Sequence, residues 1–445
     1  MGDVISKQIE RRRAIQTQEK TLNDLMRIDG EDYPGSEYYL ITRETWMHDL
    51  NPEKLQIKKI VWPGTHDSAT NEIGIPFITR PFAQCQSYSI YEQLLMGTRV
   101  LDIRVQKDRK VCHGILITYS VDIVIDDIKR FLSETKSEII ILEVRTEYGH
   151  EDPPDFDMYL EEKLGDYLIP NDEQVFEKTI GELLPKRVIC VWKPSKLPKP
   201  EAGGMLWSEG YLRDNWINTD LPETKFESNL EYLSKQEPVN TRKYFYRVEN
   251  TVTPVPDNPI VCVKPVTERI HAYARLFISQ CFTKQIGDRL QIFSTDFIDE
   301  DFVDACVGLT YARAQGIKNI VATVTAELKT EDSVSVMASL YEVLGISMGA
   351  SCHEIKAAYR KLARTCHPDV VAMNQKESSA NMFMKIHSAY STLSDPAKRA
   401  KYDRETYGHM VMMRSSSNMA ASASMSGTYQ SFCQQGRKWE TDQCW

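Results

Sequence analysis

The chain has 445 residues, 42% hydrophobic and 26% charged, a composition that excludes both a single small module and a largely disordered protein. Its 63 acidic side chains outnumber its 54 Lys and Arg side chains, and the net charge of -9 argues against nucleic acid as a partner. The ten cysteines include no C-x-x-C pair and no Cys/His cluster at zinc spacing, so we expect free thiols and no structural zinc.

Residues 1–40 form a charged, helix-permissive segment whose first six residues, MGDVIS, fit the N-myristoylation pattern at Gly2. Lys7 and the run from Arg11 to Arg13 would supply the second membrane signal that a single acyl chain needs. An unmodified charged helix is the alternative. No apolar run approaches the roughly 20 residues of a membrane-spanning helix, and no secretory signal is visible. We therefore expect a cytoplasmic protein, either free or peripheral on the inner face of the plasma membrane.

Short β-branched runs alternate with longer mixed segments from about residue 55 to residue 325. This alternation is typical of a parallel sheet covered on both faces, and the length favours an α/β barrel of the TIM type. The expected strands are 57–62, 98–105, 138–145, 187–192, 291–294 and 318–324.

Three polar clusters stand at or just beyond the carboxyl ends of these strands, where barrel enzymes build their sites. They contain His66-Asp67, Asp102-Ile103-Arg104 and His113-Gly114. Two histidines with a guanidinium between them can cleave a phosphodiester, because one ring accepts a proton from the attacking hydroxyl and the other protonates the leaving oxygen. A lone His-Asp pair in a glycine turn is more often a hydrogen-bonded loop, so the prediction depends on the whole set.

This set, in this order, resembles the X domain of phosphatidylinositol-specific phospholipase C. The matching segments are WPGTHDSAT at 62–70, QSYSIYEQLLMGTRVLDIRV at 86–105, VCHG at 111–114 and FLSETKSEIIILEVRTEYG at 131–149. The resemblance covers roughly residues 41–325. It implies a distorted α/β barrel that cleaves phosphatidylinositol-type lipid to diacylglycerol and cyclic inositol phosphate.

The resemblance also implies a role for each matching residue. His66 is the expected general base on the inositol 2-hydroxyl, and His113 is the expected general acid for the diacylglycerol oxygen. Asp67 is expected to support the acid or the arginine. Asp102 and Arg104 complete the expected phosphate pocket.

Three further residues extend the expected site. Asp296, which follows the expected strand 291–294, is predicted to orient His66. Arg145 falls where family members place an inositol-contacting or metal-liganding residue, with an ion pair to Glu147 or Asp102 as the alternative. Lys193 is a candidate inositol contact, although a solvated surface position is favoured. Tyr246, Arg247 and Glu249 lie in a polar segment that could line the inositol pocket, but a surface strand is favoured.

Arg104 and Arg145 occupy two positions where calcium-dependent members carry acidic ligands. A guanidinium repels calcium and can itself hold a phosphate through paired hydrogen bonds. The resemblance therefore favours the metal-independent type, and we expect neither a metal nor a cofactor. A lipid-binding scaffold without turnover is the alternative, because a phosphate pocket needs many of the same cations.

An acidic linker, 326–338, precedes a purely helical pattern at 339–408. The segments SLYEVLGISMGASCHEIKAAYRKLARTCHPD and FMKIHSAYSTLSDPAKRAKYDR resemble the J domain of DnaJ co-chaperones. The resemblance implies a small all-α domain that engages a DnaK-type chaperone and stimulates its ATPase through His367, Pro368 and Asp369.

A basic stripe at helical spacing precedes this tripeptide and suits an acidic partner surface. It consists of Lys356, Arg360, Lys361 and Arg364. The tail 409–445 is rich in serine, is expected to be disordered, and ends in a segment that resembles plant small J proteins of the chloroplast type. Because no transit peptide is seen, the chloroplast is not the favoured compartment. A functional tether between the two modules and an adventitious fusion both stay open.

Overall fold

The computed structural model describes residues 2–38, 40, 42–255, 262–317 and 340–344, together with single positions between 355 and 402. The chain divides into two compact units, Met1–Thr330 and Glu331–Trp445, which are described separately. The expected strand 318–324, the linker, the His367-Pro368-Asp369 tripeptide, the basic stripe and the tail lie outside the described residues.

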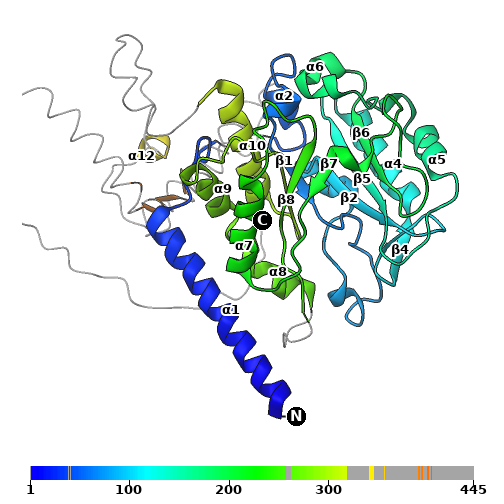
Figure 1. Cartoon of the computed structure of the whole chain (residues 1–445). Coiled ribbons are helices and arrows are strands. Elements are labelled where there is room, and N and C mark those ends of the chain that lie inside the picture. The colour runs from blue at the N-terminus through cyan, green and yellow to red at the C-terminus, as the bar shows by residue number, and fades with distance from the viewer. Residues whose placement is uncertain are drawn as a thin grey trace, which may run out of the picture. The chain divides into compact units, whose positions relative to one another are not determined.

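A nine-stranded sheet forms the centre of the first unit (Figure 1). Seven strands pair in parallel in the order β6-β5-β2-β1-β9-β8-β7, and a hairpin, β3-β4, is attached to the edge of β2. Their bounds are β1 (Trp62–Thr65), β2 (Val100–Val105), β3 (Lys110–His113), β4 (Leu116–Ser120), β5 (Ile140–Thr146), β6 (Val188–Lys193), β7 (Leu212–Asp214), β8 (Phe245–Asn250) and β9 (Ile292–Thr295). No ladder joins β6 to β7 in the part of the chain that the structure describes. The predicted α/β class is confirmed, and the barrel is an incomplete one.

Helices surround this sheet and pack on its outer face (Figure 1). They are α1 (Gly2–Asp29), α2 (Trp46–Asp49), α3 (Ile90–Leu95), α4 (Val121–Glu134), α5 (Phe156–Leu164), α6 (Ile180–Leu183), α7 (Pro222–Ser234), α8 (Val263–His271), α9 (Ala274–Thr283) and α10 (Glu300–Gln315). One apolar cluster packs the sheet against α4 and α5, and a second packs it against α7, α9 and α10. Each fully buried Val, Leu, Ile or Phe contributes about 1.5–3 kcal/mol, so this core fixes the strands and the polar residues at their ends.

The strand predicted at 57–62 is wrong over most of its length. Ile57–Lys59 is a 3₁₀ helix, and β1 begins only at Trp62. The side chains of Ile57, Ile60 and Val61 are nevertheless fully buried. A short apolar run signals burial but does not separate a strand from a helical turn, and that ambiguity explains the error.

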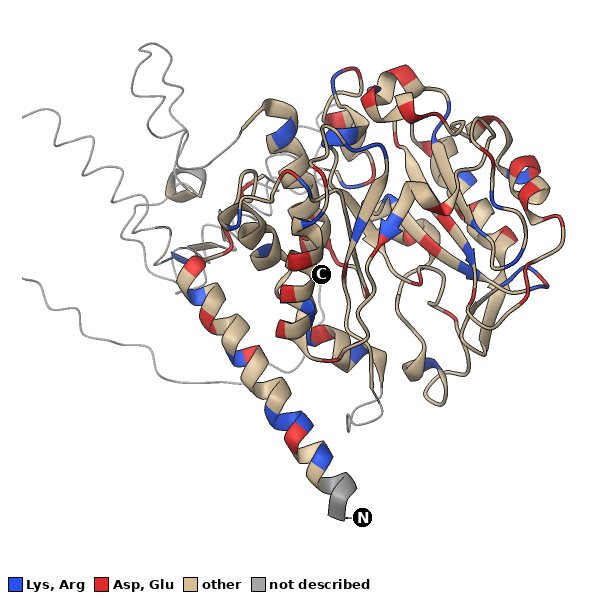
Figure 2. Ribbon diagram, viewed as in Figure 1, with Lys and Arg blue, Asp and Glu red and all other residues tan. Residues whose placement is uncertain are grey.

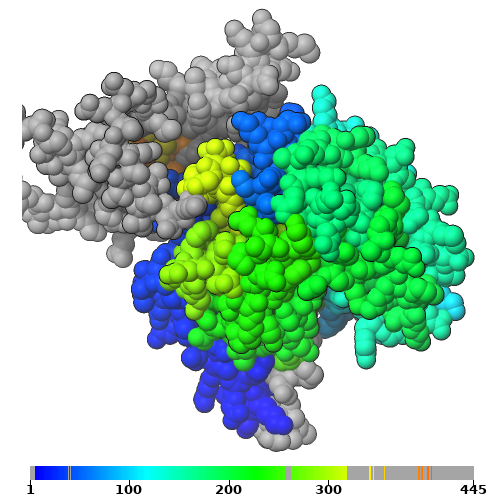
Figure 3. All heavy atoms as spheres, turned by 45° about the horizontal axis from the view of Figure 1, so that its top comes forward, coloured from blue at the N-terminus to red at the C-terminus, as the bar shows by residue number. Residues whose placement is uncertain are grey.

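The long helix α1 confirms the helical expectation for the amino terminus and carries both signs of charge along its length (Figure 2). It packs on α7, and Figure 3 shows this N-terminal segment lying against the body of the first unit. Arg11 Nε donates to Asp220 Oδ1 at 2.8 Å, and the Asp220 side chain is fully buried. Arg11 is therefore held on the protein, whereas Arg12 and Arg13 are exposed. Myristoylation of Gly2 stays a prediction.

The described part of the second unit is small. It contains α12 (Leu340–Val343) and buried side chains at Ile355, Ala389 and Leu393. Arg399 Nε donates to the Tyr341 hydroxyl at 2.8 Å, which ties the first helix to a segment 58 residues later. Within the described residues, no helix combines the length and the apolar character needed to cross a bilayer.

Candidate active site

The six residues predicted for catalysis converge at the carboxyl ends of neighbouring strands. Strand register explains the pairing of His66 with Asp296: Thr65 of β1 lies opposite Thr295 of β9, so the next residue of each strand leaves the sheet beside the other. Asp67 and Phe297, which adjoin this pair, both have left-handed backbones, with φ of 44° and 48°. That region is unfavourable for residues with a Cβ, and strain of this kind concentrates at functional sites.

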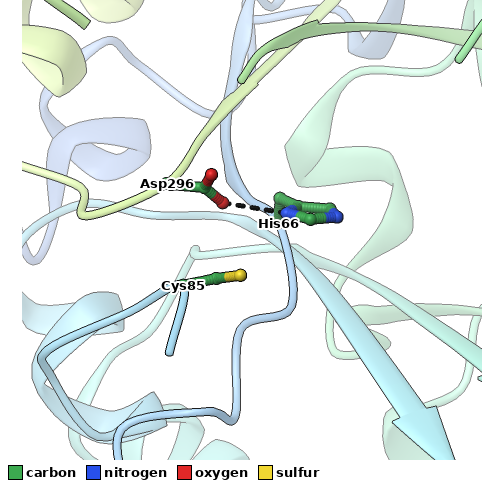
Figure 4. Close-up of side chains that lie close together, drawn as sticks. All are labelled: His66, Cys85 and Asp296. Atoms are coloured by element: carbon green, nitrogen blue, oxygen red, sulfur yellow. Dashed lines mark hydrogen bonds and ion pairs between the residues drawn. The ribbon is translucent and has the colours of Figure 1, made fainter. Parts of the chain in front are cut away.

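His66 is buried and held from both sides of its ring. Its Nδ1 donates to Asp296 Oδ1 at 2.8 Å (Figure 4), and Thr267 donates its hydroxyl to the other oxygen of that carboxylate at 2.9 Å. On the opposite edge, Arg104 Nη2 donates to His66 Nε2 at 2.7 Å. The Trp216 ring stacks on the imidazole, with centroids 5.4 Å apart. These contacts fix the tautomer that keeps Nε2 as the acceptor.

The charge around His66 favours its protonated form. Burial lowers the pKa of His66, but the carboxylates of Asp67 and Asp296 outweigh burial and raise it to about 9. The hydrogen bond from Arg104 requires the neutral ring, because a protonated Nε2 has no lone pair to accept it. Proton loss from His66 and the approach of Arg104 are therefore coupled.

His113, at the end of β3, points its second nitrogen at the same place. Its Nδ1 donates to the Ala83 carbonyl at 2.8 Å, which leaves Nε2 facing the site. The Nε2 atoms of His113 and His66 each lie 3.5 Å from one oxygen, Oδ2 of Asp67. The two rings thus converge on one small region, as proton transfer to and from the two ends of one phosphodiester requires.

Arg104 lies among three carboxylates. Its Nε is 2.8 Å from Asp67 Oδ1, and other guanidinium nitrogens lie 3.3 Å from Asp102 Oδ2 and 3.6 Å from Glu147 Oε2. Burial lowers the pKa of Arg104, but these carboxylates outweigh burial and raise it, so the side chain stays charged. Burial raises the pKa of Asp102, but Arg104 and the more distant Arg247 and Arg145 hold it well below its usual range.

Arg145 and Lys193 meet at Glu143, a carboxylate that the sequence prediction missed. Lys193 Nζ lies 2.8 Å from Glu143 Oε1, and Arg145 Nε lies 3.7 Å from the same oxygen. The position favoured for Lys193, on the solvated surface, is wrong, because its side chain is only 8% exposed. Glu143 was detectable as a charge that directly follows an apolar run in β5, a strand buried at six of its seven positions.

The surface strand predicted at 246–249 is also wrong. Residues 246–249 belong to β8, which is buried at all six positions between β7 and β9. Arg247 is 1% exposed and pairs with Glu143 at 2.5 Å, Asp214 at 2.9 Å and Glu249 at 2.9 Å. The charge of Arg247 and the charges of its acidic partners neutralise one another inside the barrel. The polarity of a segment does not by itself distinguish such a buried network from a surface strand.

A cavity of about 680 Å³ opens beside these groups. Arg104, Arg145 and Lys193 line it together with the segment from Thr146 to Glu151. The missed residues Thr267 and Trp216 come from α8 and from the loop after β7. Sequence spacing gave no signal for either residue, because both lie far along the chain from the motifs that surround His66.

Two family models match the chain. Residues 61–193 match "Phosphatidylinositol-specific phospholipase C, X domain", and residues 339–403 match "DnaJ domain". The chain contains a PI-PLC X domain and a DnaJ domain. The two predicted resemblances are thereby confirmed, although the X-domain match is shorter than the expected 41–325.

Known relatives of the DnaJ domain are close in sequence. "Chaperone protein dnaJ 11, chloroplastic" of Arabidopsis thaliana is 51% identical over 112 residues, which are 25% of this chain and 63% of that protein. "Chaperone protein DnaJ" of Shouchella clausii is 52% identical over 69 residues, which are 16% of this chain and 17% of that protein. The chain thus spans less than two thirds of the length of either relative.

Solved structures resemble the PI-PLC part at low identity. The phosphatidylinositol-specific phospholipase C from Listeria monocytogenes is 18% identical, covers 60% of this chain and 99% of its own, and gives a TM-score of 0.49. A mutant of the corresponding Staphylococcus aureus protein is 17% identical, covers 62% and 98%, and gives a TM-score of 0.48.

Proposed function

We propose that the first unit is a phosphoric diester hydrolase that cleaves phosphatidylinositol-type lipid to diacylglycerol and cyclic inositol phosphate without a metal ion. One observation carries the proposal: the Nε2 atoms of His66 and His113 each lie 3.5 Å from the same oxygen of Asp67, beside Arg104. A phosphoryl group in this region would have a proton acceptor on one side, a proton donor on the other and a fixed positive charge in contact.

In the proposed reaction, His66 Nε2 accepts the proton of the inositol 2-hydroxyl as that oxygen attacks phosphorus. The bond from phosphorus to the diacylglycerol oxygen breaks, and His113 Nε2 donates a proton to the departing oxygen. Arg104 turns from His66 to the phosphoryl oxygens, where a guanidinium forms paired hydrogen bonds. Asp296 and Thr267 position the His66 ring throughout.

The surroundings of Arg104 support a reaction without calcium. The carboxylates of Asp67, Asp102 and Glu147 all lie within 3.6 Å of the Arg104 guanidinium and already surround it. A calcium ion takes six to eight oxygen ligands and would have to displace this cation first. We expect chelation of calcium to leave turnover unchanged.

Two features support a phosphoinositide headgroup in a lipid surface. Arg145 and Lys193 line the cavity next to Arg104 and are the proposed contacts of the inositol ring. Beyond His113, the rim is apolar, since Phe77 is 96% exposed and Ile115 is 88% exposed. The Phe77 loop lies beside the β3-β4 hairpin, because Gly74 N donates to Ile117 O. Large exposed apolar side chains grouped at a site rim are typical of contact with a membrane or a partner.

The decisive experiment measures release of cyclic inositol phosphate from phosphatidylinositol vesicles by the full chain and by its His113→Ala variant. We expect release by the unchanged chain, a loss of about 10²–10⁴-fold in the variant, and unchanged vesicle binding. Vesicle binding without release by either protein would reject the hydrolase and favour the alternative, a lipid-binding scaffold.

We also propose that the DnaJ domain recruits a DnaK-type chaperone. The support is the match of residues 339–403 to the DnaJ domain and the 51% identity to a curated chaperone protein over 112 residues. The tripeptide His367-Pro368-Asp369 and the stripe Lys356, Arg360 and Lys361 are the proposed contacts. Substitution of His367→Gln should abolish stimulation of the chaperone's ATPase without unfolding the domain, and unchanged stimulation would contradict the assignment.

A further inference from the structure

Cys85 has no part in the proposed reaction, yet its thiol lies between the two histidines of the site. Its sulfur is 4.0 Å from Asp67 Oδ2 and 4.0 Å from His113 Nδ1. Figure 4 shows the thiol beside the hydrogen-bonded pair of His66 and Asp296. One ligand atom each from Asp67, Cys85 and His113 lies within 4.8 Å of the other two, and the same holds for His66, Cys85 and Asp296. Sulfur, imidazole nitrogen and carboxylate oxygen thus meet twice around one thiol.

The two groups differ in which atoms are already engaged. His66 Nδ1 and Asp296 Oδ1 bind each other at 2.8 Å, and the second oxygen of Asp296 accepts the Thr267 hydroxyl. In the other group, Arg104 occupies Oδ1 of Asp67, while Oδ2 has only contacts of 3.5 Å and longer. His113 uses Nδ1 for the Ala83 carbonyl, so its Nε2 is available. An ordinary hydrogen bond spans about 2.7–3.2 Å, so the second group offers the freer electron pairs.

We propose that Asp67, Cys85 and His113 form an inhibitory binding site for a thiophilic divalent cation of the zinc class. Thiolate, imidazole and carboxylate are the ligands that zinc takes, and three protein ligands leave a fourth position for water. Calcium and magnesium prefer sites made of oxygen alone, so they are not expected to bind here. Around a tetrahedral zinc the ligand atoms lie roughly 3.3–3.7 Å apart. Asp67 Oδ2 lies 3.5 Å from His113 Nε2 and 4.0 Å from Cys85 Sγ, so these two separations need at most a small contraction.

Charge permits a dication at this place. The guanidinium of Arg104 opposes it, but Asp67, Asp102 and Glu147 surround that guanidinium, and Asp296 adds a further carboxylate behind His66. On binding, the Cys85 S–H bond breaks, the proton leaves to solvent and a sulfur–metal bond forms. No oxidant or reductant is needed.

Inhibition is the consequence that rests on the proposed function. A metal on His113 Nε2 occupies the nitrogen that must deliver a proton to the departing oxygen, and it fixes Asp67 between the two rings. The zinc-class cation would therefore stop turnover, and a chelator would restore it. This response is the opposite of the one expected from an enzyme that needs its metal.

Binding is tested on the full chain without any lipid. Cadmium is the probe, because a cadmium–thiolate bond has an ultraviolet charge-transfer band that reports sulfur ligation directly. The unchanged chain, Cys85→Ser and the matched control Cys190→Ser are titrated in parallel; Cys190 is buried in β6 and belongs to neither ligand group. We expect Cys85→Ser to lose one thiolate equivalent of the band and Cys190→Ser to lose none. An undiminished band in a folded Cys85→Ser would overturn the site.

A second variant guards against a local collapse in Cys85→Ser. The variant His113→Gln keeps the thiol but removes the nitrogen ligand, and we expect its zinc affinity by calorimetry to fall by more than about tenfold. Full affinity in His113→Gln would contradict the ligand set.

Activity separates this inference from the function on which it rests. Zinc should inhibit lipid cleavage by the unchanged chain at the concentration that fills the site, and Cys85→Ser should resist by more than about tenfold. If neither the unchanged chain nor Cys85→Ser cleaves lipid, the hydrolase proposal fails. The cadmium titration still tests the metal site in that case. If lipid is cleaved and zinc inhibits both proteins equally, the inference fails and the hydrolase proposal stands.

Discussion

The two halves of the site are held in different ways. Around His66 and His113, a hydrogen bond of ordinary length fixes Nδ1 of each ring, and Nε2 faces the site, where Arg104 donates to that of His66. Around Glu143, three cations share one buried carboxylate, and little freedom is left. The first half can change its proton occupancy, whereas the second is a fixed charge network. We infer that the first half carries the chemistry and the second holds the headgroup.

The largest effect is expected from Asp296→Asn in the first half. The general base must be unprotonated, so activity should rise with pH, and the pKa of His66 near 9 places the acidic limb of kcat/KM near pH 9. Because the Asp296 carboxylate raises this pKa, Asp296→Asn should move the limb to lower pH. It should also lower kcat by about 10²–10⁴-fold through loss of ring orientation. A pH–rate profile measures both changes, and an unmoved limb would contradict the assignment of the base.

Glu143→Gln tests the second half. Removing one partner of a buried ion pair costs about 3–5 kcal/mol, because Lys193 and Arg247 are left without their shared carboxylate. We expect this loss in the free energy of unfolding by urea denaturation, and a raised KM. Glu231→Gln, at an exposed ion pair with Lys235 on α7, is the matched control. If Glu143→Gln costs no more than this control, the network does not stabilise the fold.

The variant Arg104→Lys tests whether Arg104 serves the chemistry or the binding of the headgroup, because Arg104 contacts His66 as well as the carboxylates. A lysine keeps the charge but loses the paired hydrogen bonds to a phosphoryl group. We expect kcat to fall by about 10²–10³-fold with vesicle binding retained. Parallel assays of turnover and vesicle binding check this split, and an equal loss of both would place Arg104 in headgroup binding alone.

The smallest effect is expected from Thr267→Val. The substitution removes one hydrogen bond to Asp296, which is worth about 0.5–1.5 kcal/mol. As a positioning residue, Thr267 should affect kcat and the pH profile and leave KM unchanged. Thr267→Ser, which keeps the hydroxyl, should restore the unchanged profile. A defect that Thr267→Ser shares would show a packing role instead.

The contrast between the halves also explains what the sequence could predict. The residues around His66 and His113 sit in short motifs at strand ends, and the same strand-end argument placed Asp296, 230 residues away, within hydrogen-bonding distance of His66. Their roles in catalysis stay predictions until the variants are measured. The Glu143 network was missed because its members come from separate strands and are polar. A charged residue looks like surface until its partner is known, and the partners of Arg247 are up to 104 residues away.

The left-handed backbones at Asp67 and Phe297 bear on which substitutions this site can accept. Each costs the folded chain roughly 1–2 kcal/mol that glycine would not lose. At position 67, however, glycine would also remove the buried carboxylate that lies 2.8 Å from Arg104 Nε, and breaking a buried ion pair costs about 3–5 kcal/mol. The loss of the ion pair exceeds the relief of the backbone, so the charge of Arg104 keeps an aspartate in a conformation that its own backbone disfavours.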